Sequence, residues 1–261
     1  MKKLFFFTLA VIVFLFSSCG KAEEQDKKPE DPRGSDGKVT VLLDAGHGFR
    51  DVGCTSEYLE GQYEYQLTMD FVCDLKQKLE AKGYTVILTH DGESYISESE
   101  LCALADKHGI TYARDNIKPD NSVFDAYERA IYSSVLDAEL EIDFMLSIHV
   151  NANASSNECV GFEIDYCAEN ESSAQTKYVF DSICRALERD FEGRELKKFA
   201  DSWADSFIVT KYNTMPSILF ETGFASTPSE AELLLDPEWR SELTDSLALG
   251  IIEYFETEYK K

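Results

Sequence analysis

The chain has 261 residues, with 49 acidic side chains against 25 basic ones and a formal net charge of −24. A field of this sign argues against nucleic acid and against anionic membrane surfaces as partners, and it otherwise serves solubility. The sequence contains seven cysteines and only four histidines. This scarcity makes the position of each histidine informative.

Residues 1–18 predict an export signal. Lys2 and Lys3 precede the uncharged run Leu4–Phe16, which is shorter than the roughly 20 residues that a membrane-spanning helix needs. Small residues then stand directly before Cys19, a pattern that resembles a bacterial lipoprotein signal in which this cysteine becomes the lipidated first residue. An ordinary signal peptide cut nearby is the alternative. We therefore expect an exported protein attached to the membrane only through a lipid on Cys19, facing the periplasm or the cell surface.

Residues 19–37 predict a flexible tether. They carry many charges and no large apolar side chain, so they bury too little surface to become ordered. A single domain of about 220 residues is expected to follow over residues 38–261, within the usual size range. Its cysteines leave two interpretations open, which are disulfides suited to an exported protein and buried free thiols.

Short apolar runs alternate with helical patterns along this domain. Clusters of Val, Ile, Leu and Phe predict strands over residues 39–44, 84–89, 144–149, 161–166, 206–209 and 217–220. Apolar residues spaced by four predict helices over residues 67–79 and 243–255, and a further helix is expected over residues 172–189. Gly83 is expected to end the first helix. This order predicts an α/β fold, a single domain with a mixed, mostly parallel central sheet covered by helices on both faces.

Four side chains with metal-binding or acid–base chemistry stand next to apolar runs. They are His47, Glu64, His149 and Glu221. Ligands of α/β sheets collect beyond the carboxyl ends of the strands, which is where three of the four fall. Imidazole and carboxylate suit zinc, and three protein ligands leave a fourth position open for water, as in a catalytic site. The remaining carboxylate would then transfer protons.

Two of these residues, His47 and Glu64, also have a plainer interpretation. His47, between two glycines, could bond a loop carbonyl at a strand end. Glu64 opens a helix, where the dipole favours a carboxylate, and Glu57 or Glu60 could reach inward in its place. Glu221 is the hardest to explain by structure alone, because a buried glutamate needs a partner that the sequence does not supply. Burial would instead raise its pKa towards that of a general base.

The motifs LLDAGHG, SIHVNA, GFEIDY and MPSILFETGF resemble those of the zinc-dependent N-acetylmuramoyl-L-alanine amidases, with Glu64 opening the helix after the first motif. The resemblance is to the catalytic domain called amidase type 3, from Val39 to the C-terminus. It implies one Zn²⁺ per chain held by His47, Glu64 and His149, with Glu221 as the catalytic carboxylate. It also implies a peptidoglycan or muropeptide substrate, cut between N-acetylmuramic acid and L-alanine. Whether an activator protein acts on the chain stays open.

Two further residues are expected to contact substrate. Asn151 follows His149, although such an asparagine is more commonly a turn residue. Arg129 stands where the family carries an arginine. The segment between Asp91 and Arg129 is longer than the family core needs, and residues 97–108 predict a short helix. An inserted helix covers the zinc in some relatives, so an acidic residue here could plug the site. An insertion that shapes the substrate groove is the alternative.

Two other functions are compatible with these residues. One is a non-catalytic muropeptide-binding lipoprotein, which the presence of all three ligands and the carboxylate argues against. The other is a zinc peptidase that cuts within the stem peptide, because zinc, water and a glutamate would attack any well-placed amide. Product analysis separates them, since only the amidase releases a peptide that begins with L-alanine.

Overall fold

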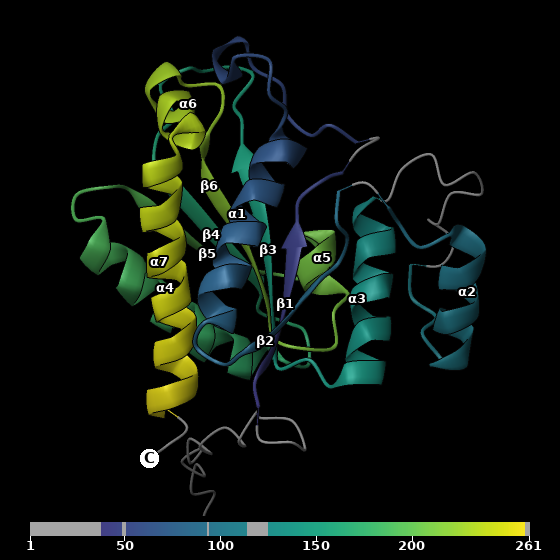
Figure 1. Ribbon diagram of the computed structural model, residues 1–261. Coiled ribbons are helices and arrows are strands. Elements are labelled where there is room, and N and C mark those ends of the chain that lie inside the picture. Colours follow the sequence, from purple (N-terminus) through teal and green to yellow (C-terminus); the bar gives the residue numbers. More distant parts are fainter. Residues whose placement is uncertain (1–37, 49–50, 93, 114–124, 259–261) are drawn as a thin grey trace, which may run out of the picture.

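The protein forms one six-stranded sheet in the part of the chain that the computed structural model describes, residues 38–48, 51–92, 94–113 and 125–258. The strand order is β2-β1-β3-β6-β4-β5 (Figure 1). The first four of these strands run parallel, and β4 runs antiparallel to β6 with β5 parallel to β4. The strands are β1 Thr40–Ala45, β2 Thr85–Leu88, β3 Phe144–Asn151, β4 Phe162–Cys167, β5 Leu196–Asp201 and β6 Ser217–Phe224.

Helices cover both faces of the sheet, which confirms the predicted fold class. One face packs against α1 Glu64–Glu80, α4 Ser173–Asp190 and α7 Pro237–Glu253 (Figure 1). The other face carries α3 Ala126–Leu140 and α5 Ile208–Lys211, with α2 Glu98–Lys107 on the outside of α3. The remaining helical segments are the 3-10 turn Glu57–Leu59, α6 Pro228–Leu235 and the π-turn Tyr254–Glu258.

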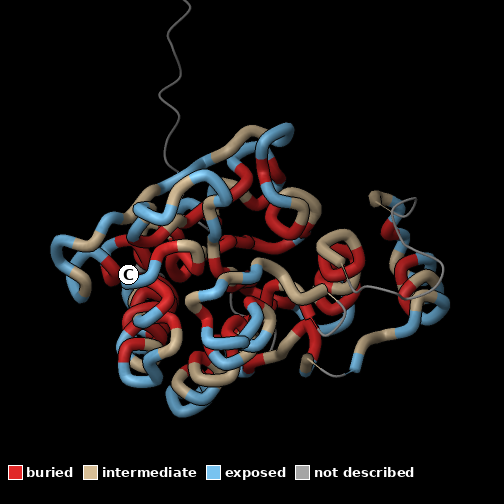
Figure 2. Tube along the Cα trace, turned by 90° about the horizontal axis from the view of Figure 1, so that it is seen from above, coloured by how far each residue is buried: buried red, intermediate tan, exposed pale blue. Residues whose placement is uncertain are grey.

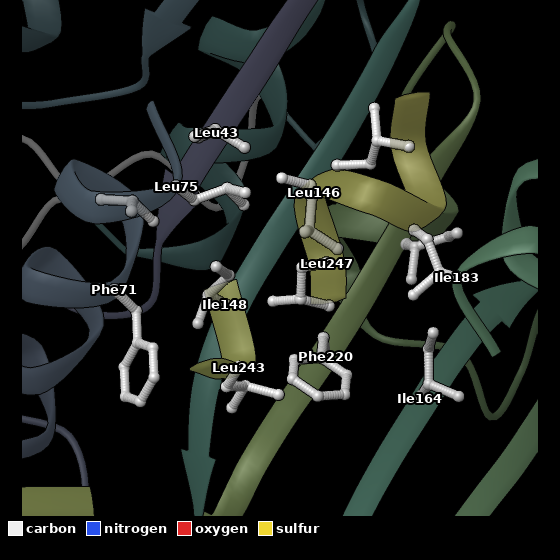
Figure 3. Packing of buried hydrophobic residues seen from close by; sticks show 14 of the residues in the cluster. Leu43, Phe71, Leu75, Leu146, Ile148, Ile164, Ile183, Phe220, Leu243 and Leu247 are labelled. Atoms are coloured by element: carbon white, nitrogen blue, oxygen red, sulfur yellow. The ribbon is translucent and has the colours of Figure 1, made fainter. Parts of the chain in front are cut away.

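A continuous hydrophobic cluster fills the space between the sheet and the first helical layer. Successive side chains of a strand point to opposite faces, so alternate residues of β1, β3 and β6 enter this cluster. Figure 3 shows strand side chains meeting those of the helices, among them Leu43, Leu146, Ile148, Phe220, Phe71, Leu75, Leu243 and Leu247. Removing apolar surface from water stabilises the folded state by about 25 cal/mol per Å². The buried segments accordingly run through the middle of the molecule in Figure 2.

The opposite face of the sheet is less uniformly apolar. Leu42, Met145 and Leu219 belong to one small cluster on this side, and a second cluster joins α2 to α3. A wholly buried carboxylate, Asp44, lies on the same face and pairs with Arg129 at 3.1 Å. The functional side chains described below come from this face and from the adjoining edge of the sheet.

The strand predicted over residues 206–209 is wrong. This stretch enters the one-turn helix α5, in which Val209 is only 2% exposed. A short apolar run cannot distinguish a buried strand from one turn of a buried helix. The strand that the sequence analysis missed is β5, which lies at the edge of the sheet. Its sequence LKKFAD is half polar, and its side chains are all partly or fully exposed. Natural edge strands often carry lysines, and here they hide the strand signal.

The other predicted elements are present. The three predicted helices correspond to α1, α4 and α7, and the short helix predicted in the insertion corresponds to α2. Gly83 follows α1 with a positive φ of 90°, a conformation that glycine adopts easily. All six described cysteines are free. The predicted signal peptide, the tether and Cys19 lie outside the described residues, and no described helix is long and apolar enough to cross a membrane.

Candidate metal centre

His47 lies in the turn that follows β1. Its backbone is left-handed, with φ 66°, and Gly46 before it packs directly against the His149 ring. A Cβ on Gly46 would lie 2.5 Å from that ring, so only glycine lets the end of β1 approach so closely. His47 Nδ1 is 2.9 Å from Asp51 Oδ2, and since a carboxylate only accepts, Nδ1 carries the proton. Nε2 therefore remains available as a ligand atom.

Glu64 is the first residue of α1 and is 3% exposed. Its Oε2 accepts the Cys54 N–H at 2.7 Å, and its Oε1 accepts the Val150 N–H at 3.0 Å. Gly53 permits this closeness, because a Cβ there would lie 2.6 Å from Glu64 Oε2. Burial raises the pKa of Glu64, but hydrogen bonds with the two histidines outweigh it and hold the pKa well below its usual range. The group is therefore a carboxylate.

The three predicted ligands come together at the carboxyl end of the parallel strands. His47 Nε2 lies 3.2 Å and His149 Nδ1 lies 3.1 Å from Glu64 Oε1. One donor atom from each of the three residues lies within 4.8 Å of the others. Zinc bonds of about 2.0–2.1 Å in a tetrahedral arrangement would separate neighbouring ligand atoms by roughly 3.3 Å. The donor set therefore fits zinc in both chemistry and spacing.

Glu221 stands beside this group because β3 and β6 are in register, with His149 opposite Glu221. The register of the two strands shifts only after this pair, between His149 and Asn151. Glu221 Oε2 is buried and has no hydrogen-bond partner among the described residues. Burial first, and then the charges of Glu64 and Glu163, raise the pKa of Glu221 to about 8. A carboxyl group with such a pKa is suited to proton transfer near neutral pH.

The two predicted substrate contacts are placed differently. Asn151 is partly exposed, and its Nδ2 donates to Glu163 Oε2 at 2.7 Å. Glu163 lies on β4 directly opposite Glu221, so Asn151 borders the candidate centre. Arg129 is 2% exposed and lies beneath the end of β1, where its Nε pairs with Asp44.

Two residues of the centre escaped the sequence analysis. Asp51 orients His47, and its only signal is a carboxylate four positions after the histidine. Glu163 faces Glu221 across the antiparallel pair β4–β6, which sequence patterns do not reveal. Lys197 of the edge strand donates to Glu163 Oε1 at 3.0 Å.

The predicted insertion helix does not cover the donor group in this structure. Leu101 and Ala105 of α2 pack against the outer side of α3, and Lys107 and His108 both bond Glu139 of α3. Figure 1 shows α2 at the periphery of the molecule. The geometry of α2 therefore lends no support to a plug.

The layered sheet and the His–Glu–His group at its carboxyl edge define an α/β protein with the ligand set of a metallohydrolase. The model of the N-acetylmuramoyl-L-alanine amidase family matches residues 41–253, and the chain belongs to this family of peptidoglycan amidases.

Similar proteins agree with this assignment. The germination-specific N-acetylmuramoyl-L-alanine amidase of Bacillus subtilis is 30% identical over 221 residues, covering 84% of this chain and 80% of that protein. The amidase AmiA of Escherichia coli is 24% identical and covers 90% of this chain and 82% of its own. A crystal structure of an N-acetylmuramoyl-L-alanine amidase from Clostridium difficile 630 shares the fold, with a TM-score of 0.64, 23% identity and coverage of 84% and 98%. The CwlD amidase of Clostridioides difficile, solved in complex with the GerS lipoprotein, also has a TM-score of 0.64, at 22% identity and with coverage of 83% and 98%.

Proposed function

We propose that the chain is a zinc-dependent hydrolase that cleaves the amide between N-acetylmuramic acid and L-alanine in peptidoglycan or muropeptides. The observation that carries this proposal is the meeting of donor atoms from His47, Glu64 and His149 within 4.8 Å of one another. The Glu221 carboxyl group stands beside them, and its buried Oε2 has no hydrogen-bond partner among the described residues. Family membership supports the amidase class, and the donor spacing supports zinc.

Three side chains would hold one Zn²⁺ and leave a position open for water and substrate. They are His47 through Nε2, Glu64 through a carboxylate oxygen, and His149 through Nδ1. Bound there, the ion would polarise the water and the scissile carbonyl. Asp51 keeps the proton of His47 on Nδ1, and two backbone amides fix the Glu64 carboxylate. Such supporting bonds set the orientation and basicity of metal ligands.

Glu221 is the proposed proton-transfer group. As its carboxylate, it accepts a proton from the water while the water oxygen bonds to the lactyl carbonyl carbon. It then donates that proton to the L-alanine nitrogen while the carbon–nitrogen bond breaks. The pKa of about 8 supports both steps, because the carboxyl group can hold and release a proton near neutral pH. The products are a free peptide that begins with L-alanine and an uncut glycan.

Asn151 and Arg129 stay predictions as substrate contacts. Asn151 borders Glu221 through Glu163, so its amide is well placed for a polar group of the substrate. Arg129 would have to leave Asp44 to touch substrate directly. The hydrogen bond with His47 is the main cause of the lowered pKa of Asp51, and the Arg129 charge makes only a minor contribution to it.

We further propose that the protein is exported and lipid-anchored through Cys19, with residues 19–37 as a tether. The support is the apolar segment after two lysines and the small residues before Cys19. A cell-envelope enzyme would meet its peptidoglycan substrate there, and the net charge of −24 does not favour nucleic acid.

The decisive experiment combines zinc analysis with mass spectrometry of the products from a defined muropeptide. We expect one zinc per chain and release of a peptide with N-terminal L-alanine. Glu221→Gln should retain the zinc and lose about 10²–10⁴-fold in kcat, because it removes the proton acceptor. The matched control is Glu232→Gln on the exposed side of α6, which should keep full activity.

The possible outcomes separate the candidate functions. Products cut inside the stem peptide would identify a peptidase. Bound zinc with tight muropeptide binding and no turnover would identify a binding protein. Full activity of Glu221→Gln would remove this residue from the mechanism.

A further inference from the structure

A cavity lies at the opposite edge of the sheet from the candidate metal centre. Its volume is about 440 Å³, and it lies among the segment after β4, the segment after β5 and the segment before β6. Strand β6 runs from Ser217, near this cavity, to Glu221 at the metal centre. At about 3.3 Å per residue along a strand, Ser217 and Glu221 are roughly 13 Å apart. A ligand in this cavity is therefore separate from the scissile amide.

Aromatic rings that touch one another form one wall of the cavity. Tyr112 and Tyr212 are stacked, with centroids 5.3 Å apart and an angle of 11° between the rings. Trp203 meets Tyr212 edge to face at 5.4 Å and remains 42% exposed. The exposed part of the Trp203 ring offers apolar surface to a ligand in the cavity.

The arrangement of the rings favours a flat neutral ligand. A cation is normally held between aromatic faces that stand apart and surround it, whereas these rings are in mutual contact. The Lys211 ammonium group already lies 6.0 Å from the Tyr212 ring centre. The wall is therefore not a cage for a cation, although the Lys211 cation lies beside it.

Polar groups occupy the rest of the lining. Asn213 is 7% exposed, and its Nδ2 donates to the Val209 carbonyl, which fixes the orientation of the amide. Its Oδ1 has no hydrogen-bond partner within the described residues. Glu169 Oε2 accepts a hydrogen bond from the backbone N–H of Trp203 at 2.8 Å and holds this segment beside the cavity. Glu171 and Thr214 add exposed polar side chains at the rim.

We propose that this cavity, the Trp203 cavity, binds a saccharide, with one sugar face on the exposed surface of the Trp203 ring. A sugar ring presents C–H groups on its faces and hydroxyl or acetamido groups at its edges, which matches an aromatic wall with polar groups of both signs around it. The volume is in the range of small-ligand sites. The Trp203 cavity would then give the protein a second grip on a glycan, on the far side of the sheet from the amide being cut.

The test is titration of the full-length protein with chitohexaose, a peptide-free oligomer of N-acetylglucosamine, followed by calorimetry. Trp203→Ala should weaken binding by about tenfold, the equivalent of one lost aromatic contact, and Trp203→Phe should restore part of it. The matched control is Phe207→Ala, which removes a nearby aromatic ring that is 46% exposed and does not line the cavity. This control should bind as the parent protein does.

Thermal unfolding checks that each variant is still folded, and turnover of a short muropeptide by Phe207→Ala should match that of the parent. Absence of chitohexaose binding, or equal binding by the parent and Trp203→Ala, would overturn the assignment. So would binding of choline in preference to the sugar. Because binding is measured without turnover, a failure of the amidase proposal would show separately, as loss of muropeptide cleavage in the parent protein.

Discussion

The two faces of the sheet are built from the same strands but carry different chemistry. On β3, Leu146 and Ile148 enter the large apolar cluster, while Ser147 and His149 between and after them face the other side. On β6, Phe220 faces the apolar layer and Glu221 its opposite. One face therefore supplies most of the hydrophobic stabilisation, and the other holds buried polar and ionisable groups.

This division shows how a rigid sheet can hold groups that are costly to bury. Asp44 is wholly buried, yet Ser147 and Thr89 each donate to it at 2.7 Å and Arg129 pairs with it. Burial alone would raise its pKa, but the nearby Arg129 charge and these bonds keep it lowered. The charge of Asp44 is thus compensated, whereas buried oxygens of Glu221, Asp165 and Asn213 lack a hydrogen-bond donor among the described residues.

The largest effect on stability is expected from breaking the buried ion pair of the polar face. Arg129→Met leaves the Asp44 carboxylate uncompensated and should lower the free energy of unfolding by about 3–5 kcal/mol. Adding Asp44→Asn should recover much of the loss, because the buried charge is then gone. Urea denaturation of the single and double variants measures both effects. A double variant no more stable than Arg129→Met would show that the pair is not the cause.

A truncation on the apolar face should cost somewhat less. Leu146→Ala deletes a fully buried side chain of the large cluster and should lower the free energy of unfolding by about 2–4 kcal/mol. Because its side chain points away from the metal centre, zinc content of the folded variant should be unchanged. Loss of zinc at temperatures where the variant remains folded would contradict the separation of the two faces.

The support given by Asp51 should appear in metal affinity. Asp51→Asn weakens the bond that orients His47 and should reduce zinc affinity by about 10–100-fold, measured by competition with a chelator. The exposed Asp205→Asn is the matched control.

Affinity should also depend on pH through the same histidine. Burial lowers the pKa of His47, but its hydrogen bonds to Asp51 and Glu64 have the opposite and larger effect, so that the pKa is raised to about 9. Below that pH, zinc must displace a proton, so affinity should fall by about tenfold per unit as pH decreases. A pH-independent affinity would show that His47 is not a ligand.

The smallest effect concerns Asp165, a buried carboxyl of β4 that lies beside Asp201 and receives no hydrogen bond from a donor among the described residues. Burial first, and then Asp201, raise its pKa to about 8. Between about pH 4 and pH 8 the folded chain holds a proton that the unfolded chain has lost, so stability falls as pH rises.

Asp165→Asn should reduce this slope of stability against pH and stabilise the protein by about 1–3 kcal/mol at pH 8. Unfolding free energies at pH 5 and pH 8 test it, with Asp181→Asn on the exposed side of α4 as control. Part of the slope should persist, because Glu221 titrates in the same direction. An unchanged slope in Asp165→Asn would assign the whole effect to other groups.

The sequence predicts the apolar half of this architecture well and the polar half poorly. Strands β1, β3 and β6 are near-continuous apolar runs because both their faces are covered, and α1 shows a regular apolar stripe. Helix α3 buries Arg129, Ser133 and Ser134, so it lacks such a stripe and was not predicted. Binary patterning assumes that buried positions are apolar, which fails where polar groups pair inside.

Part of the candidate metal centre could be predicted from the sequence for a related reason. His47, His149 and Glu221 follow or end apolar runs, so strand topology alone predicts that they meet. Asp51 and Glu163 act through a turn and an antiparallel pairing, which depend on tertiary structure. The roles of the metal ligands and of the proton-transfer group stay predictions for the zinc analysis to test.

The register of β3 and β6 fixes the distance between two of the functional side chains. His149 and Glu221 are paired across two hydrogen-bonded strands, so their spacing cannot change without moving side chains from one face to the other. His47, by contrast, lies in a turn, where no strand pairing fixes its position. Sequence changes among related proteins should therefore spare the His149–Glu221 pair and fall in the surrounding loops. The substrate can then change while the geometry of the reacting groups stays the same.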